Sequence, residues 1–237
     1  MSNLSTTNLP AAGGGGVKKT LDPGNQICRI NSVELVPFTF KEGAMELRFN
    51  MEGPDMGPEF EGFWINKDDQ SLGRHKGQVG RVKATEWAFA DGETKGGTKI
   101  SRDTEIMKWI NSFCEAIGKK EWMTAQDQKH ATIESLVNAF AIDKPFKGID
   151  LNLCIAGKEY LTKENYTNHD LFLPKFSKDG VPFELVGVAK SKLIKYDPTK
   201  HIVKKKAAAT VTNFTGDPNA TGNPTQEGSG VGADFEL

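Results

Sequence analysis

Apolar and polar residues alternate most regularly between Ala44 and Glu52. Such a period of two predicts a strand with one buried face and one exposed face. The predicted inner face carries Met45, Leu47, Phe49 and Met51, and the outer face carries Glu46, Arg48, Asn50 and Glu52.

Three further strands are predicted in the first half of the chain. Gln26–Phe40 is rich in Ile, Val and Phe and predicts a long strand that breaks near Pro37, and a turn at Lys41–Gly43 joins it to the alternating strand. The Gly- and Pro-rich run after Glu52 ends that strand, because neither residue type continues a ladder well. Glu59–Asn66 and Val79–Ala90 are predicted as the third and fourth strands.

The hydrophobic period then changes to that of a helix. Ser101 is a suitable N-cap for a helix that runs to Gly118. A second helix is predicted over Thr132–Phe140. The apolar stripe of the first helix places Trp109 in the core rather than on a binding surface. This stripe consists of Ile106, Trp109, Ile110, Phe113, Cys114 and Ile117.

Strand patterns return in the last third. Leu151–Thr162 and Tyr166–Phe176 predict a hairpin, and Phe183–Tyr196 predicts a final strand. Lysines alternate along that final strand at Lys190, Lys192 and Lys195. Strands, a helical insert at about 101–140, and further strands follow the order of an OB-like Greek-key barrel. The predicted fold class is therefore mainly β with a helical insert.

Composition divides the chain into three parts. Residues 1–24 are rich in Ser, Thr, Asn and Gly and predict a flexible arm, residues 25–204 predict the OB-like domain, and residues 205–237 predict a disordered, mildly acidic tail. The whole chain is nearly neutral, with 30 Lys and Arg against 31 Asp and Glu. Because residues 207–237 hold four acids and no Lys or Arg, the remainder is mildly basic.

The stretch from Glu59 to Ala90 combines aromatic residues with positive charge. Cations for phosphates and flat rings for bases are what a site for single-stranded nucleic acid requires. The alternative is that these rings belong to the core and that the basic loop is simply solvated. The stretch carries Trp64, Arg74, His75, Lys76, Arg81, Lys83 and Trp87.

Patterns typical of enzymes are absent from the sequence. The three cysteines lie far apart, so they predict neither disulfides nor a zinc site and favour a reducing compartment. His169 beside Asp170 and the pair Asp68 and Asp69 are more typical of structural and turn roles than of catalysis or metal binding. With no P-loop, no signal peptide and no long apolar run, we expect a cytoplasmic protein without enzyme activity, cofactor, metal or membrane contact.

Several phrases of the sequence resemble phage-encoded single-stranded DNA-binding proteins. They are FKEGA, GRHKGQVGRVKATEWAFADG and LNLCIAGKEY, followed by YTNHDLFLPKFSKDGVPFE. The resemblance implies an OB-type fold and a role in phage DNA replication or recombination in the host cytoplasm. It also implies that an acidic, aromatic C-terminus docks on phage replication or recombination proteins, and here that end carries Asp234, Phe235, Glu236 and Leu237.

These observations together predict a sequence-tolerant single-stranded DNA-binding protein. Bases would stack on Trp64, Trp87, Tyr160, Tyr166 or Phe172, each of which could instead be a core residue. Phosphates would contact Arg74, Lys76, Arg81, Lys83, Lys158, Lys190, Lys192 and Lys195. The alternative is a phage structural or assembly protein that interacts with proteins and binds no nucleic acid.

Overall fold

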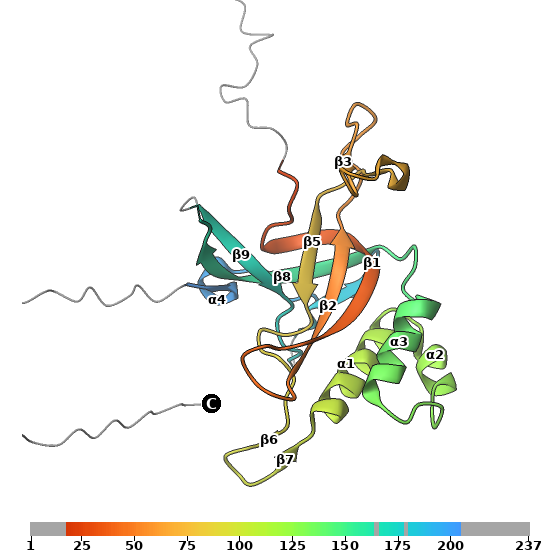
Figure 1. The fold of residues 1–237 in the computed structure, drawn as a ribbon, viewed down its shortest axis with the longest axis vertical. Helices are drawn as coiled ribbons and strands as arrows, with labels where there is room; N and C mark the ends of the chain where they lie inside the picture. The colour runs from red at the N-terminus through yellow and green to blue at the C-terminus, as the bar shows by residue number, and fades with distance from the viewer. Residues whose placement is uncertain (1–17, 164–165, 178–179, 205–237) are drawn as a thin grey trace, which may run out of the picture. The chain divides into compact units, whose positions relative to one another are not determined.

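The computed structural model of the chain describes residues 18–163, 166–177 and 180–204. The fold of this part is mainly β, with three helices gathered on one side of the sheet (Figure 1). The elements are β1 (Gly24–Pro37), β2 (Met45–Glu52), β3 (Phe63–Trp64), a 3-10 turn (Gln70–Leu72), β4 (Arg74–His75), β5 (Val79–Lys83), β6 (Gly92–Glu93), β7 (Lys99–Ile100), α1 (Arg102–Ala116), α2 (Lys120–Ala125), α3 (Ile133–Asp143), β8 (Leu151–Leu161), β9 (Thr167–Phe172), β10 (Phe183–Leu185), α4 (Pro198–His201) and β11 (Ile202–Val203).

Five strands form a closed barrel in the order β1-β2-β5-β9-β8, and β8 pairs back with β1. Neighbouring strands are antiparallel except β5 and β9, which run parallel. The segment with α1, α2 and α3 lies in the chain between β5 and β8, the third and fourth strands of the barrel. This arrangement is consistent with the OB-like barrel that the sequence predicts.

The long strand β1 closes the barrel because it pairs with two different neighbours. Its first part, Gly24–Cys28, pairs with β8, and its second part, Arg29–Pro37, pairs with β2. The register shifts between Ile30 and Ser32, so Asn31 occupies a bulge. A bulge bends a strand and increases its twist, which allows one strand to join both edges of the sheet.

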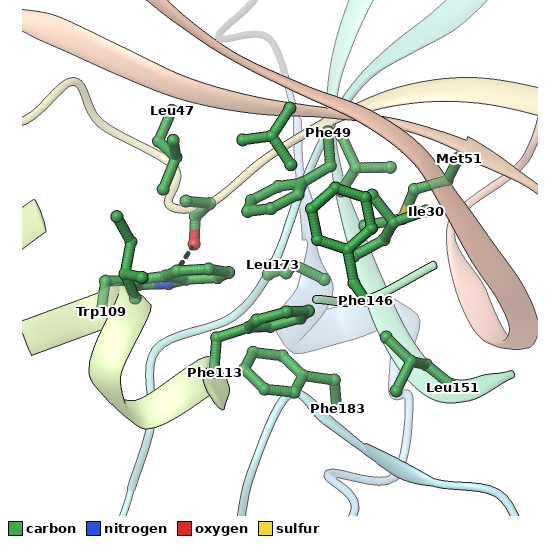
Figure 2. Packing of buried hydrophobic residues seen from close by; sticks show 14 of the residues in the cluster. Ile30, Leu47, Phe49, Met51, Trp109, Phe113, Phe146, Leu151, Leu173 and Phe183 are labelled. Atoms are coloured by element: carbon green, nitrogen blue, oxygen red, sulfur yellow. Dashed lines mark hydrogen bonds between the residues drawn. The ribbon is translucent and has the colours of Figure 1, made fainter. Parts of the chain in front are cut away.

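The core lies between the inner face of the barrel and α1 (Figure 2). The alternation in β2 is confirmed from Leu47 onward, where Leu47, Phe49 and Met51 are buried and the residues between them are partly exposed. At the start of the strand Met45 is only partly buried, and Glu46, predicted on the exposed face, is buried. Phe49 packs against Trp109 and Phe113, with ring centroids 5.0 and 5.9 Å apart. The indole N–H of Trp109 donates to the Ala84 carbonyl at 3.1 Å.

The two predicted helices are confirmed, and their ends follow the expected chemistry. Ser101 caps α1 through its side chain, and Thr132 caps α3 in the same way. Gly118 follows α1 with a φ of 69°, a conformation that glycine adopts without steric cost. The short helix α2 lies between them and has no side-chain cap or buried residue, so no local pattern indicated it.

Four predicted strands are shorter than the sequence pattern suggested. The third is reduced to Phe63–Trp64 because Gly62, with a φ of 99°, redirects the chain before it. The fourth ends at Lys83. The second strand of the predicted hairpin runs only over Thr167–Phe172. The predicted strand Phe183–Tyr196 is wrong beyond Leu185, where a turn with Gly187 at a φ of 86° breaks the ladder, so the three lysines do not alternate along a strand.

Contacts with the barrel begin before the boundary that the sequence suggested at Asn25. Leu21 is buried, and its backbone N–H donates to the Val79 carbonyl at 2.9 Å. Thr20 forms a parallel bridge with Val79. Residues 18–24 therefore belong to the folded domain.

Among the helices of the described ranges, none combines the length and apolar character needed to span a bilayer.

Two tryptophans provide a matched test of this core. Trp109 is buried, whereas Trp87 is 63% exposed. We expect Trp109→Ala to lower the free energy of unfolding by about 3–5 kcal/mol, because it opens a cavity and removes the donor to Ala84. Trp87→Ala should change it by less than about 0.5 kcal/mol. Urea denaturation measures both, and equal effects would contradict the assignment of Trp109 to the core.

Candidate nucleic-acid interface

The barrel opens between β5 and β9. Only Val82 and Lys83 of β5 pair with β9, opposite Leu171 and Phe172. Beyond these pairs the strands diverge and leave a groove of about 580 Å³. Its walls include Arg81 from β5, Lys158 and Tyr160 from β8, and Asn168 and Asp170 from β9, and Leu21 covers its base.

Close packing at the base of the groove depends on Gly80. A Cβ atom at this position would come within 3.0 Å of the Leu21 side chain. Glycine therefore lets the N-terminal segment lie against β5, as the bridge between Thr20 and Val79 shows. The groove is thus shaped by a segment that the sequence pattern did not assign to the domain.

An exposed tryptophan lies beside this groove. Trp87 follows β5, and its ring centroid is 4.6 Å from Nζ of Lys158, within the range of a cation–π contact. The Thr85 hydroxyl donates to the Trp87 carbonyl at 2.6 Å, which fixes the local backbone. Tyr160, two residues along β8 from Lys158, is 42% exposed. The fold thus brings together a cation and two aromatic rings that the sequence predicted as site residues.

Acidic side chains neutralise much of the positive charge on this surface. Glu46 is only 6% exposed, because the guanidinium of Arg48 donates to it at 2.5 and 2.8 Å and Nζ of Lys83 lies 3.6 Å away. Lys83 also contacts Asp170 at 2.5 Å. A cation held between two carboxylates stabilises the fold and is poorly placed to bind phosphate, so Lys83 is mainly structural.

Arg81 is placed differently from Lys83. Its side chain is more than half exposed, and its Nε lies 3.2 Å from a carboxylate oxygen of Glu34. That oxygen is buried and accepts no hydrogen bond from the described part of the chain, so Arg81 would bind a phosphate through the exposed part of its guanidinium while its Nε stays beside Glu34. Among the residues lining the groove, Arg81 and Lys158 are the cations.

A second group of predicted site residues lies on a separate arm. The hairpin of β3 and β4 projects beyond the barrel on the far side from the helices (Figure 1). Arg74 lies over the Trp64 ring at 3.8 Å and pairs with Glu61 at 2.6 Å, which lowers the pKa of that carboxyl. Nζ of Lys76 donates to the carbonyls of Phe60 and Glu61. One face of Trp64 is therefore already covered by Arg74.

Glu52 joins this arm to the barrel. Its carboxylate accepts hydrogen bonds from the backbone N–H groups of Lys76 and Gly77 at 2.8 and 3.3 Å, and from the amide of Asn31 at 3.0 Å. Nδ1 of His75 lies 3.0 Å away. Burial by itself would raise the pKa of Glu52, but these hydrogen bonds outweigh it and leave the pKa below its ordinary value.

The remaining predicted site residues lie apart from the groove. Phe172 is buried at 6% exposure, so it is a core residue and not a stacking platform. Tyr166 is exposed at the turn between β8 and β9. Lys190, Lys192 and Lys195 are exposed in an irregular segment.

The C-terminal residues of the predicted partner-binding tail lie outside the described residues, so docking through them stays a prediction. They are Asp234, Phe235, Glu236 and Leu237.

Two exposed aromatic residues, Phe40 and Phe176, were not among the predicted site residues. Phe40 is 88% exposed at the turn between β1 and β2, with its ring 5.5 Å from that of Phe38. The run FTFKEG, with two aromatics directly before a turn, was the available signal. The turn role of Asp69 is confirmed, since its carboxylate accepts from the Ser71 N–H at 3.1 Å. Within the described ranges, no group of three or more His, Cys, Asp or Glu residues could hold a metal ion.

The lowered pKa of Glu52 predicts a pH-dependent contribution to stability. This contribution is present above the ordinary carboxyl pKa of about 4.3 and is lost as the pH falls through the lower pKa of the folded state. We expect Glu52→Gln to reduce the unfolding free energy near neutral pH and to make its decline in acid shallower than in the wild type. Urea unfolding at several pH values measures both effects. The control is Glu59→Gln, which changes an exposed carboxylate before β3. If Glu52→Gln leaves the acid slope of the unfolding free energy unchanged, the hydrogen bonds of Glu52 do not contribute to stability as proposed.

Comparison with protein-family models, with curated proteins and with solved structures found no significant match.

Proposed function

We propose that this protein binds single-stranded DNA with little sequence preference, through an OB-type Greek-key barrel, during phage DNA replication or recombination. The observation that carries the proposal is the surface around the opening between β5 and β9. There Trp87, Lys158, Tyr160 and Arg81 lie together beside a groove of about 580 Å³. It is a site for binding and positioning, with no role assigned to catalysis.

The aromatic residues favour unpaired bases as the ligand. Lys158 lies over the Trp87 ring, and the large exposed area of that ring leaves room for a base to stack on it. Tyr160 offers a second ring at the edge of the groove. Stacking on an aromatic side chain contributes about 1–3 kcal/mol per base and tolerates any sequence, because every base has a flat face. In a duplex those faces are already stacked on neighbouring base pairs.

The charges favour moderate affinity with a clear dependence on salt. Arg81 and Lys158 are available for phosphates, whereas Lys83 is held by Glu46 and Asp170. Each phosphate that a cation neutralises releases counterions from a single strand. A site with few free cations and two or more rings obtains most of its discrimination between single and double strands from stacking.

The proposal also includes partner docking through Asp234–Leu237, for which the support is the resemblance alone. The alternative, a phage structural or assembly protein, has no feature of the described surface in its favour, and the competition experiment below separates the two.

A gel shift with unlabelled competitors tests the proposed function. We expect unlabelled single strands to displace a labelled oligo-dT and duplex of the same length to compete poorly. Trp87→Ala should weaken binding by about 1–3 kcal/mol, the contribution of one stacked base. Ile142→Ala, which truncates another exposed apolar side chain on α3, is the matched control and should bind like the wild type. No shift at all would favour the assembly alternative, and equal competition by duplex would contradict the preference for single strands.

Salt dependence tests the roles of the cations. For single strands, the slope of log affinity against log salt concentration is about −0.7 for each neutralised phosphate. We expect Arg81→Ala and Lys158→Ala each to make this slope shallower by about 0.7. Lys120→Ala removes an exposed cation on α2 and should leave the slope unchanged. Unchanged slopes in the first two variants would remove both residues from the site.

A further inference from the structure

We propose that a second groove, between α1 and the chain segments 84–89 and 174–176, binds the continuation of the same single strand of DNA. This inference rests on the proposed function and extends it to the helical segment. The groove has a volume of about 380 Å³. Its lining includes Phe89, Trp109 and Phe176, together with Lys108 and Lys175.

The walls of this groove are held by hydrogen bonds to the barrel. The Trp109 indole N–H donates to the Ala84 carbonyl, and the Leu173 N–H donates to the Lys83 carbonyl at 2.9 Å. Phe89 and Met45 exchange two backbone hydrogen bonds of 2.8 Å. The groove is therefore formed before any ligand arrives, which limits the entropy that binding would cost.

The lining has the chemistry of a nucleic-acid site. Phe176 keeps part of its side chain exposed while its ring packs edge to face with Trp109 and Phe183, at centroid distances of 6.5 and 5.3 Å. Lys108 and Lys175 are exposed, and Glu105, which Lys108 contacts at 2.8 Å, is the acid among the lining residues. A ring with a fixed orientation and two accessible cations suits one base and its neighbouring phosphates.

Trp87 connects the two grooves. Thr85 and Phe89, two residues before and after Trp87, line the second groove. Lys158, which contacts the Trp87 ring, lines the first groove. A strand that stacks on Trp87 therefore lies close to both the opening between β5 and β9 and the groove beside α1. This continuity identifies the occupant of the second groove as the same strand rather than a different ligand.

The other groove beside α1 has the opposite character. It has a volume of about 500 Å³ and lies between α1 and the segment that joins α2 to α3. Asp103 and Asp127 line it, together with Met107 and Met123, and neither Lys nor Arg is among its lining residues. Asp103 is paired with Arg102 at 2.6 Å, and the lining offers no Lys or Arg to a phosphate, so the two sides of α1 differ in what they can bind.

A comparison of oligonucleotide lengths tests the inference on the full-length protein. The probes are oligo-dT of about 6 and about 16 nucleotides, within the range that OB folds cover, and binding is followed by fluorescence anisotropy. We expect the double variant Lys108→Ala/Lys175→Ala to bind the short probe like the wild type. Its affinity for the long probe should fall several-fold, with a salt slope shallower by about 0.7 for each cation removed.

The control is the double variant Lys120→Ala/Lys129→Ala, which removes two exposed cations from and just after α2. It should bind both probes like the wild type. Phe176→Leu should also weaken binding of the long probe only. Because Phe176 packs on core rings, the melting temperature of this variant is measured as well, to detect any loss of stability. If the Lys108/Lys175 variant binds both probes like the wild type, the second groove lies off the path of the strand. If the wild type binds neither probe, the proposed function fails and the inference fails with it.

Discussion

Closure of the barrel by β1 is the constraint on which the remaining structure depends. One strand must pair with β8 at its beginning and with β2 at its end, and the bulge at Asn31 provides the bend. Strand closure satisfies the backbone groups that open sheet edges would expose. The seam between β5 and β9 is joined by only two residue pairs, and there the barrel is incomplete. The candidate binding surface lies at this weak seam because the backbone itself leaves a groove there.

The bulge has a second consequence at the adjacent end of β2. The side chain of Asn31 reaches Glu52, and Glu52 in turn holds the backbone of Lys76 and Gly77. The position of the β3–β4 arm thus depends on the same irregularity that closes the barrel. A cation lies over one face of each tryptophan, Arg74 over Trp64 and Lys158 over Trp87. Trp64 is half-buried, however, whereas Trp87 and Tyr160 at the seam are exposed. This difference explains why we assign stacking to the seam and not to the arm.

Some cations on the outer face stabilise the fold, and others are accessible to a ligand. Glu46 is buried, and its carboxylate is paired with both Arg48 and Lys83. If these cations moved to a ligand, they would leave a buried carboxylate without a partner, which is strongly destabilising. Nε of Arg81 lies beside a buried carboxylate oxygen of Glu34, but the Arg81 side chain is more than half exposed and can present its remaining guanidinium N–H groups to a phosphate. The basic character of this face cannot be judged by counting lysines and arginines, since only the weakly paired ones are available to a ligand.

The sequence by itself determined the elements whose pattern is local. Alternation over Met45–Glu52 gave the strand β2, and the caps Ser101 and Thr132 with their apolar stripes gave α1 and α3, because periodicity and capping depend on near neighbours. It also indicated the order of elements along the chain, since the change from strands to helices and back is visible in the hydrophobic pattern.

Only the tertiary structure decided which predicted side chains meet. Lys83 and Asp170 are 87 residues apart, and their contact removes Lys83 from the set of free cations. Phe172 looked like Tyr160 in its alternating strand, yet pairing of β9 with both β5 and β8 buries it. Burial and charge pairing depend on partners from distant strands, and a local pattern carries no information about them.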